Sequence, residues 1–170
     1  MKVIIVYKSE TGFTETYAGF IAAALNGALV PFKDRRRLKP DPDAVLIFGA
    51  PIKASTLPGS RWFLRNRGRF KKAYAFAVGA SPADSKDLPA FLEKQKRAGL
   101  DLFYMPGGFC WEKMSRTTRF ILRNFFLPAV KKAEGEESEM YRTVSHSYSQ
   151  VDKKFADPLI QAVKKEIASD

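Results

Sequence analysis

Residues 2–14 read Lys-Val-Ile-Ile-Val-Tyr-Lys-Ser-Glu-Thr-Gly-Phe-Thr, and this stretch decides the fold class. Residues 2–7 are apolar and β-branched without alternation, which is typical of a strand buried on both faces of a sheet. The polar loop at residues 9–14 precedes an amphipathic helix predicted over about residues 15–25, with Thr14 as the expected N-cap. A buried strand, a short loop and a helix in this order begin an α/β domain.

The rest of the chain repeats this alternation. Apolar segments at about residues 28–32, 44–50, 73–79 and 101–105 predict four more strands. Helices are expected near residues 60–66, 88–97, 115–127 and 152–167, the last beginning near residue 157 if Pro158 lies in its first turn. The pattern predicts one α/β domain over residues 1–170, with a mostly parallel sheet, helices on both faces and a helical insert over about residues 107–133 after strand five.

Composition excludes several classes of protein. The 170 residues are 45% hydrophobic and 28% charged, which is ordinary for a globular domain and wrong for a disordered chain. The longest apolar run is about ten residues, half of what a membrane span needs, and the first strand leads directly into polar residues rather than a signal-peptide pattern. A single cysteine, Cys110, excludes an internal disulfide and a cysteine-built metal site. We expect a metal-free cytoplasmic protein.

The chain is basic, with 29 Lys and Arg against 18 Asp and Glu. Residues 53–72 hold seven basic and no acidic side chains, and residues 111–134 hold six basic and two acidic ones. Charge concentrated in this way favours an anionic partner, such as a phosphate, a carboxylate substrate, an acidic protein, an anionic lipid or a nucleic acid. A solvated basic face that serves solubility alone is the simpler alternative.

The 9–14 loop suits a phosphate monoester. It offers three hydroxyls, a glycine, successive free amides and the positive end of the following helix. Neither G-x-x-x-x-G-K-[ST] nor G-x-G-x-x-G is present, which disfavours a nucleotide triphosphatase and a dinucleotide site in this loop. Tyr7-Lys8 and Ala50-Pro51 stand where a response-regulator receiver needs carboxylates. The alternative is an N-capping turn without a ligand.

Ser9-x-Thr11-Gly12-x-Thr14 after a buried strand resembles the FMN phosphate loop of flavodoxins, and Gly49-Ala50-Pro51 is similar to the start of that family's first isoalloxazine loop. The resemblance implies a three-layer flavodoxin-like fold, a five-stranded parallel sheet in the order 2-1-3-4-5, and FMN as cofactor. It places the phosphate and the ring at these residues: Ser9, Glu10, Thr11, Gly12, Phe13, Thr14, Ala50, Pro51, Ile52, Lys53, Ala54, Ser55, Gly79, Ala80, Ser81, Gly107, Gly108 and Phe109.

The sequence departs from classical flavodoxins, which are acidic and hold the flavin between aromatic side chains. Residues 50–56 and 79–82 contain no aromatic residue. Residues 103–111 and the apolar insert are similar to the branch that includes flavodoxin-type protoporphyrinogen oxidases, which are basic FMN enzymes with a membrane-associated insert that pass electrons to quinones. No catalytic residue can be matched. If Lys53 lies near the pyrimidine edge of the flavin, its charge would favour the anionic reduced form and raise the potential.

The insert combines basic and apolar residues. Arg116, Arg119 and Arg123 form one helical stripe, most of the remaining positions are apolar, and Pro128 is expected to end the helix. Such a helix is buried in the core, buried in a homodimer contact, or bound to an anionic membrane surface. Nucleic acid is not expected, because no recognised module accompanies the basic residues.

Other residues near the insert have two interpretations each. Phe109 and Trp111 either stack on the flavin or anchor the insert. Cys110 is expected to be a small buried thiol rather than a redox-active one. His146, the single histidine, is expected on a surface loop.

These observations predict an FMN-binding redox protein that works with a redox partner or an anionic small-molecule substrate. One alternative is a protoporphyrinogen-oxidase-like FMN dehydrogenase, linked to quinone at the inner face of the membrane. The other is a basic binding module that kept the fold and lost the flavin.

Overall fold

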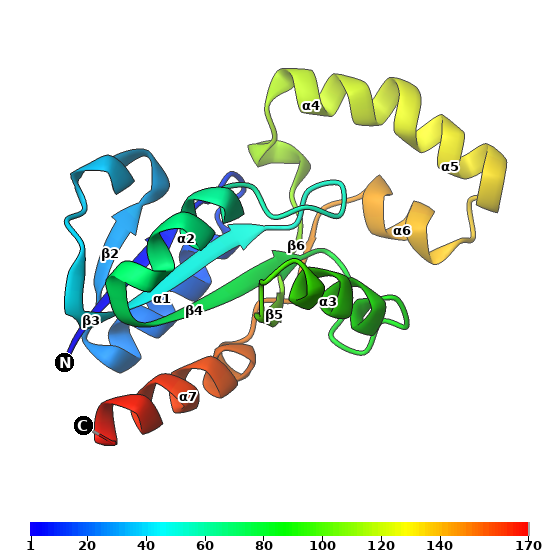
Figure 1. Cartoon of the computed structure of the whole chain (residues 1–170). Helices are drawn as coiled ribbons and strands as arrows, with labels where there is room; N and C mark the ends of the chain where they lie inside the picture. The colour runs from blue at the N-terminus through cyan, green and yellow to red at the C-terminus, as the bar shows by residue number, and fades with distance from the viewer. Residues whose placement is uncertain (170) are drawn as a thin grey trace.

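In the computed structural model, which describes residues 1–169, five parallel strands form one sheet in the order β2-β1-β3-β4-β5 (Figure 1). The predicted order is confirmed. The bounds of the strands are β1 Lys2–Tyr7, β2 Ala28–Pro31, β3 Asp41–Pro51, β4 Phe70–Gly79 and β5 Leu102–Pro106.

Both faces of the sheet are covered, which gives the three layers. Ile5 of β1 belongs to the core beneath α1 (Phe13–Leu25) and α7 (Asp157–Ala168), whereas Val6 belongs to the core beneath α2 (Ser60–Asn66). The helix α3 (Leu88–Arg97) lies beside β5 (Figure 1). Because successive side chains of a strand point to opposite faces, the unbroken apolar run of β1 fills both cores.

A close approach inside the sheet explains Gly49 of β3. Its neighbour in register on β4 is Phe76, whose ring is fully buried. A Cβ atom on Gly49 would lie 2.0 Å from the Cζ atom of that ring, so no side chain fits here.

The insert after β5 is longer than predicted. It begins with β6 (Gly108–Phe109) and η3 (Trp111–Lys113), and a helical arm then extends away from the sheet as α4 (Arg116–Ile121), η4 (Leu122–Phe126) and α5 (Leu127–Glu134) (Figure 1). A further helix, α6 (Glu139–Ser145), and β7 (Tyr148–Ser149) lead back, and β7 pairs with β6.

Two expected helix boundaries were wrong. Pro128 does not end the helix, because η4 is a π-turn in which the Leu127 amide donates to the Leu122 carbonyl. This wider turn lets the chain continue past a residue that has no N–H. Thr14 does not cap α1 either: Gly12, with φ 95°, takes the N-cap position, and Thr14 is buried within the helix.

The closing helix begins at Asp157, the later of the two expected starts, after a short 3₁₀ turn, η5 (Lys153–Ala156). Within residues 1–169, no helix is both long and apolar enough to cross a membrane.

Candidate functional site

A pocket with a volume of about 380 Å³ lies at the carboxyl ends of the strands. We call it the main pocket, because most of the predicted site residues line it. Loops that follow β1, β3, β4 and β5 contribute to it, and the helical arm forms a further wall. Its lining residues are Glu10, Thr11, Phe13, Thr14, Pro51, Ile52, Lys53, Ala54, Val78, Gly79, Ala80, Gly108, Phe109, Cys110, Met114, Thr118 and Leu122.

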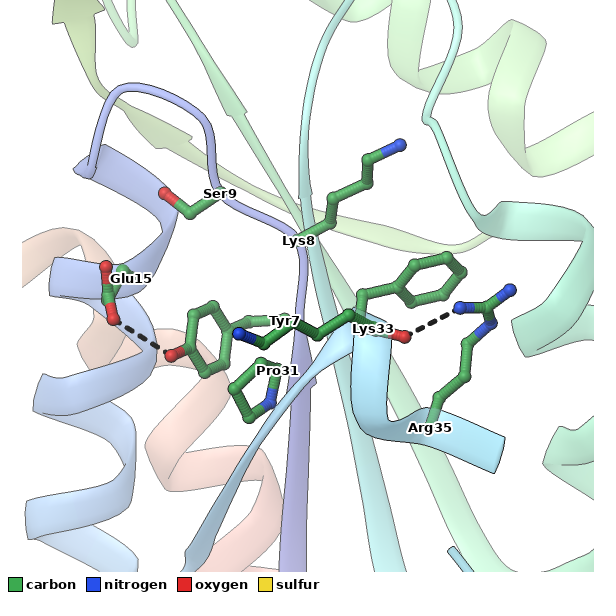
Figure 2. A pocket seen from close by; sticks show the side chains of 8 residues that line it. Tyr7, Lys8, Ser9, Glu15, Pro31, Lys33 and Arg35 are labelled. Atoms are coloured by element: carbon green, nitrogen blue, oxygen red, sulfur yellow. Dashed lines mark hydrogen bonds between the residues drawn. The ribbon is translucent and has the colours of Figure 1, made fainter. Parts of the chain in front are cut away.

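The structure brings most of the predicted site residues together in this pocket. Six predicted residues do not line it: Ser9, Gly12, Ala50, Ser55, Ser81 and Gly107. Ala50 and Gly107 are buried, and Ser55 and Ser81 are exposed. Ser9 instead lines a separate cleft on the other side of the 9–14 loop (Figure 2).

The 9–14 loop presents several hydrogen-bond donors. The Gly12 amide donates to Ser9 Oγ over 3.2 Å, while the Gly12 carbonyl accepts from the amide and the hydroxyl of Thr16. Within the described chain, the amides of Thr11, Phe13 and Thr14 have no protein acceptor. Free amides at the positive end of a thirteen-residue helix form an arrangement that binds phosphate groups.

Lys113 adds a positive charge to this loop from the insert. Its Nζ atom lies 3.3 Å from the position that a Cβ atom on Gly12 would occupy. Sequence reasoning missed Lys113, because the contact joins the first loop of the chain to a segment far along the sequence. A phosphate on the loop amides would therefore also meet an ammonium group.

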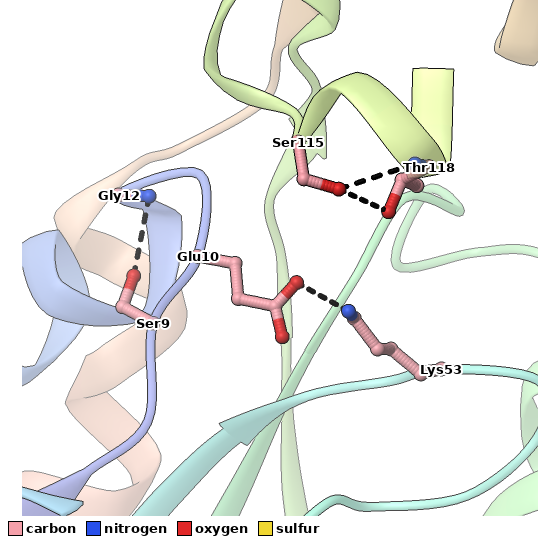
Figure 3. A network of polar contacts seen from close by, with 6 residues as sticks. All are labelled: Ser9, Glu10, Gly12, Lys53, Ser115 and Thr118. Atoms are coloured by element: carbon pink, nitrogen blue, oxygen red, sulfur yellow. Dashed lines mark hydrogen bonds and ion pairs between the residues drawn. The ribbon is translucent and has the colours of Figure 1, made fainter. Parts of the chain in front are cut away.

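Glu10 and Lys53 form an ion pair that joins the loops after β1 and β3. Figure 3 shows the two side chains pointing toward one another, with Ser115 and Thr118 at the start of α4 nearby. The pair changes the expectation for Lys53, because its charge is largely balanced by the Glu10 carboxylate. It also compensates a carboxylate that would otherwise repel a phosphate on the same loop.

The loop after β3 contains a strained turn. The amides and carbonyls of Lys53 and Thr56 bond to one another, and the residues between them, Ala54 and Ser55, have φ values of 44° and 57°. Two consecutive positive φ values define a type I′ turn, which usually contains Asn and Gly. Gln95 Nε2 donates to the Ser55 carbonyl and helps to hold this turn.

Tyrosine side chains fix the loops after β4 and β5. Tyr17 donates to the Pro106 carbonyl over 2.6 Å, and Tyr148 donates to the Ala80 carbonyl over the same distance. Burial raises the pKa of Tyr17 and, more strongly, the pKa of Tyr104. Tyr17 and Tyr104 therefore keep their protons at neutral pH, and Tyr17 acts as a fixed donor.

The inner side of the helical arm closes the main pocket. Thr118 and Leu122 lie four residues apart on the arm and line the pocket, a spacing that could have been read from the sequence, and Met114 joins them from the extended segment before α4. On its other sides, Phe120 and Phe125 are 61% and 64% exposed. The expectation that the arm is buried in the core of a single chain was wrong.

Phe109 and Trp111 have different roles. Phe109 lines the main pocket, whereas Trp111 joins the outgoing and returning parts of the insert by donating from Nε1 to the Val144 carbonyl of α6 over 3.0 Å. Cys110 is only partly buried and lines the pocket, and its thiol contacts Glu112 at 3.3 Å. The expectation of a buried thiol was therefore wrong.

His146 is exposed, as the sequence indicated. Among the side chains that the structure describes, no group of three or more from His, Cys, Asp and Glu could hold a metal ion.

Residues 4–137 match the family model of the flavodoxin domain. The chain belongs to the flavodoxin-domain family. This match includes most of β1, the 9–14 loop, the other four strands of the sheet and most of the insert. A comparison with curated protein sequences gives no match.

Three solved structures are similar to this flavodoxin-domain chain. A flavodoxin from the domain Archaea is 18% identical over 79% of this chain and 99% of its own, with a TM-score of 0.45. Two proteins provisionally assigned as flavoproteins, from Bacteroides eggerthii and Bacteroides uniformis, are 20% and 16% identical, with TM-scores of 0.38 and 0.42. They cover 61% and 72% of this chain, and 85% and 98% of their own. The family assignment rests on the family model.

Proposed function

We propose that this flavodoxin-domain protein binds FMN in the main pocket and transfers electrons to or from a partner or an anionic small molecule. The observation that carries the proposal is the pocket itself, in which free amides of the 9–14 loop meet the loops after β3, β4 and β5. FMN, when bound, supplies the chemistry of accepting and donating electrons or a hydride. The protein sets orientation, potential and access.

The residues of the pocket fit FMN at both ends. The amides of the 9–14 loop, the Thr11 hydroxyl and the Lys113 ammonium would hold the phosphate. Ile52, Ala54 and Phe109 offer apolar surface for the ring system. A pocket of about 380 Å³ with apolar walls and a few polar groups has the usual character of a cofactor site.

The arm limits the access of water to the ring end of the pocket. Met114 and Leu122 line the pocket with aliphatic side chains, whereas a classical flavodoxin is expected to present an aromatic side chain to the ring. We expect Leu122→Asp to weaken FMN binding by placing an unpaired carboxylate against the ring. Thr117→Asp is a matched control, since Thr117 is exposed on the same helix and does not line the pocket.

FMN binding is measured by quenching of flavin fluorescence, and redox activity by reduction and reoxidation of the bound flavin. Saturable binding that is weaker in the Leu122→Asp variant than in the Thr117→Asp variant supports the proposal. A protein that binds no FMN under any condition contradicts it and favours the flavin-free binding module.

A second function is favoured by the outer surface of the arm: an FMN dehydrogenase, linked to quinone, at an anionic membrane surface. Phe120, Ile121 and Phe125 are more than half exposed, and Arg116 and Arg123 are exposed on the same helix. Apolar side chains beside arginines are suited to a lipid surface with anionic head groups. The same helix lines the pocket, so lipid contact would place the pocket beside the membrane.

Vesicle sedimentation tests this second function. We expect binding to anionic vesicles and not to neutral ones, and loss of binding in a Phe120→Ser, Phe125→Ser variant. Leu29→Ser is the control, because Leu29 is an exposed apolar residue of β2, outside the insert. No difference between these variants would contradict membrane contact, and a change of molecular mass from dimer to monomer would assign the arm to a homodimer contact.

A further inference from the structure

A second concave surface, the basic cleft, lies at the carboxyl ends of β1 and β2. It has a volume of about 670 Å³ and is lined by Tyr7, Lys8, Ser9, Glu15, Pro31, Phe32, Lys33 and Arg35 (Figure 2). Ser9 lines this cleft, and the next residue, Glu10, lines the main pocket. The two sites are therefore neighbours across the 9–14 loop but share no lining residue.

The basic cleft is suited to an anion. Within the described chain, Lys8, Lys33 and Arg35 form no ion pair with a carboxylate. Ser9 Oγ accepts from the Gly12 amide, which leaves its own proton free to donate to a ligand. Uncompensated ammonium groups and a free hydroxyl, from different elements around one hollow, match a phosphate group.

Glu15 gives the cleft an acceptor as well. Its carboxylate accepts from the Tyr7 hydroxyl over 2.9 Å and keeps further lone pairs free (Figure 2). A carboxylate weakens the binding of a simple anion, but it is the group that commonly binds the hydroxyls of a ribose. Burial raises the pKa of Tyr7, so its phenol stays protonated and holds Glu15 in place.

The floor of the cleft is apolar and rigid. Pro31 and Phe32 form it, and the Phe32 ring packs against Trp62 at 5.7 Å between centroids, edge to face. The Arg35 guanidinium lies 4.0 Å from the same ring and donates to the Phe32 carbonyl over 2.8 Å. Because the guanidinium lies over the Phe32 ring, a planar base would stack on Arg35 and make apolar contact with Pro31.

We propose that the basic cleft binds a nucleoside phosphate. Lys8, Lys33 and Ser9 would hold the phosphate, Glu15 the ribose hydroxyls, and Pro31 with Arg35 the base. The ligand is either a free nucleotide or the adenylate half of a dinucleotide, since both present the same chemistry to these residues. This site is independent of FMN binding in the main pocket.

The two tryptophans of the chain provide separate reporters. Trp62 contacts Phe32 of the basic cleft, whereas Trp111 contacts Phe109 of the main pocket. A Trp111→Phe variant therefore keeps only the reporter of the cleft. Titrating it with ADP is expected to give a saturable change in tryptophan emission, and no saturable change would overturn the proposal.

Charge-reversal variants locate the binding. In the Trp111→Phe background, Lys8→Glu and Lys33→Glu should each weaken ADP binding roughly fivefold or more, as reversal of an exposed charge beside an anion does. Lys164→Glu makes the same change of net charge at an exposed position of α7 and should leave the affinity unchanged. If all three substitutions weakened ADP binding equally, the effect would come from the net charge of the protein, and the assignment of the site to the basic cleft would be overturned.

The choice of probe tests the rest of the ligand. The proposal requires that both the phosphate and the nucleoside contribute to binding. If pyrophosphate or adenosine alone bound as tightly as ADP, this combined recognition would be overturned. NADH keeps both hydroxyls of its adenosine ribose, so tighter binding of NADH than of ADP would indicate a dinucleotide, and equal binding a free nucleotide. Calorimetry on FMN-loaded protein is expected to show unchanged ADP affinity, and competition by FMN would overturn the claim of a separate site.

Discussion

The strained turn after β3 gives a prediction with an unusual sign: Ala54→Gly should stabilise the protein. Ala54 has φ 44°, and its side chain is exposed. Left-handed backbone costs a residue with a Cβ atom about 1–2 kcal/mol, and glycine loses about 0.5–1 kcal/mol through the greater freedom of its unfolded chain. The difference predicts that the free energy of unfolding rises by roughly 0.5–1 kcal/mol.

Urea denaturation measures this change as a shift of the midpoint at constant slope. Ala23→Gly is the matched control, because Ala23 is also exposed but lies within the helix α1. There the same chemical change should lower the stability by about 1 kcal/mol. If both variants lost stability equally, Ala54 would not have a left-handed backbone, and the type I′ turn would be wrong.

Two further predictions concern the core and the insert. Gly49→Ala should destabilise the protein by at least about 2–3 kcal/mol in urea denaturation, because the new methyl group would overlap the buried Phe76 ring; an unchanged midpoint would contradict the packing of β3 against β4. Hydrogen bonding, above all from Ser147, lowers the pKa of Glu112 below its ordinary value of 4.5. The hydrogen bond from the Ser147 hydroxyl to the Glu112 carboxylate should therefore persist at pH 4.5 and above. It should be lost as the pH falls through the lowered pKa and the carboxylate is protonated. Emission from Trp111, whose amide donates to Ser147, should change only in that acidic range, and Glu112→Gln should abolish the change.

The strands of the sheet could be predicted because each one is specified by a short, contiguous stretch of sequence. Each strand is a short apolar run, and a run such as β1 has to be buried on both faces. The 9–14 loop could be predicted for the same reason, since its hydroxyls, glycine and following helix are contiguous. The strand order came from the resemblance to flavodoxins, because the periodicity of a strand does not specify its neighbours.

The insert could not be predicted in the same way, because its contacts join residues far apart in the sequence. The pairing of β6 with β7 returns the chain to the sheet, and neither two-residue strand has a recognisable pattern. Pro128 was expected to end the helix, but the π-turn before it satisfies the backbone. Lys113 reaches Gly12 only through this tertiary arrangement.

The departure at Thr14 has a local cause. A threonine before a helical pattern is a good N-cap candidate, but the positive φ of Gly12 already turns the chain into the helix two residues earlier. Thr14 then faces the main pocket rather than the helix amides.

The affinity for FMN compared with that for riboflavin tests the central claim most directly, because the two ligands differ only in the phosphate. Charge-assisted bonds from the loop amides and Lys113 predict that FMN binds on the order of a hundredfold more tightly or better. Thr11→Asp and Lys113→Gln should reduce this ratio and leave riboflavin binding nearly unchanged. Equal affinities for FMN and riboflavin, unaffected by either substitution, would contradict a phosphate site in the 9–14 loop.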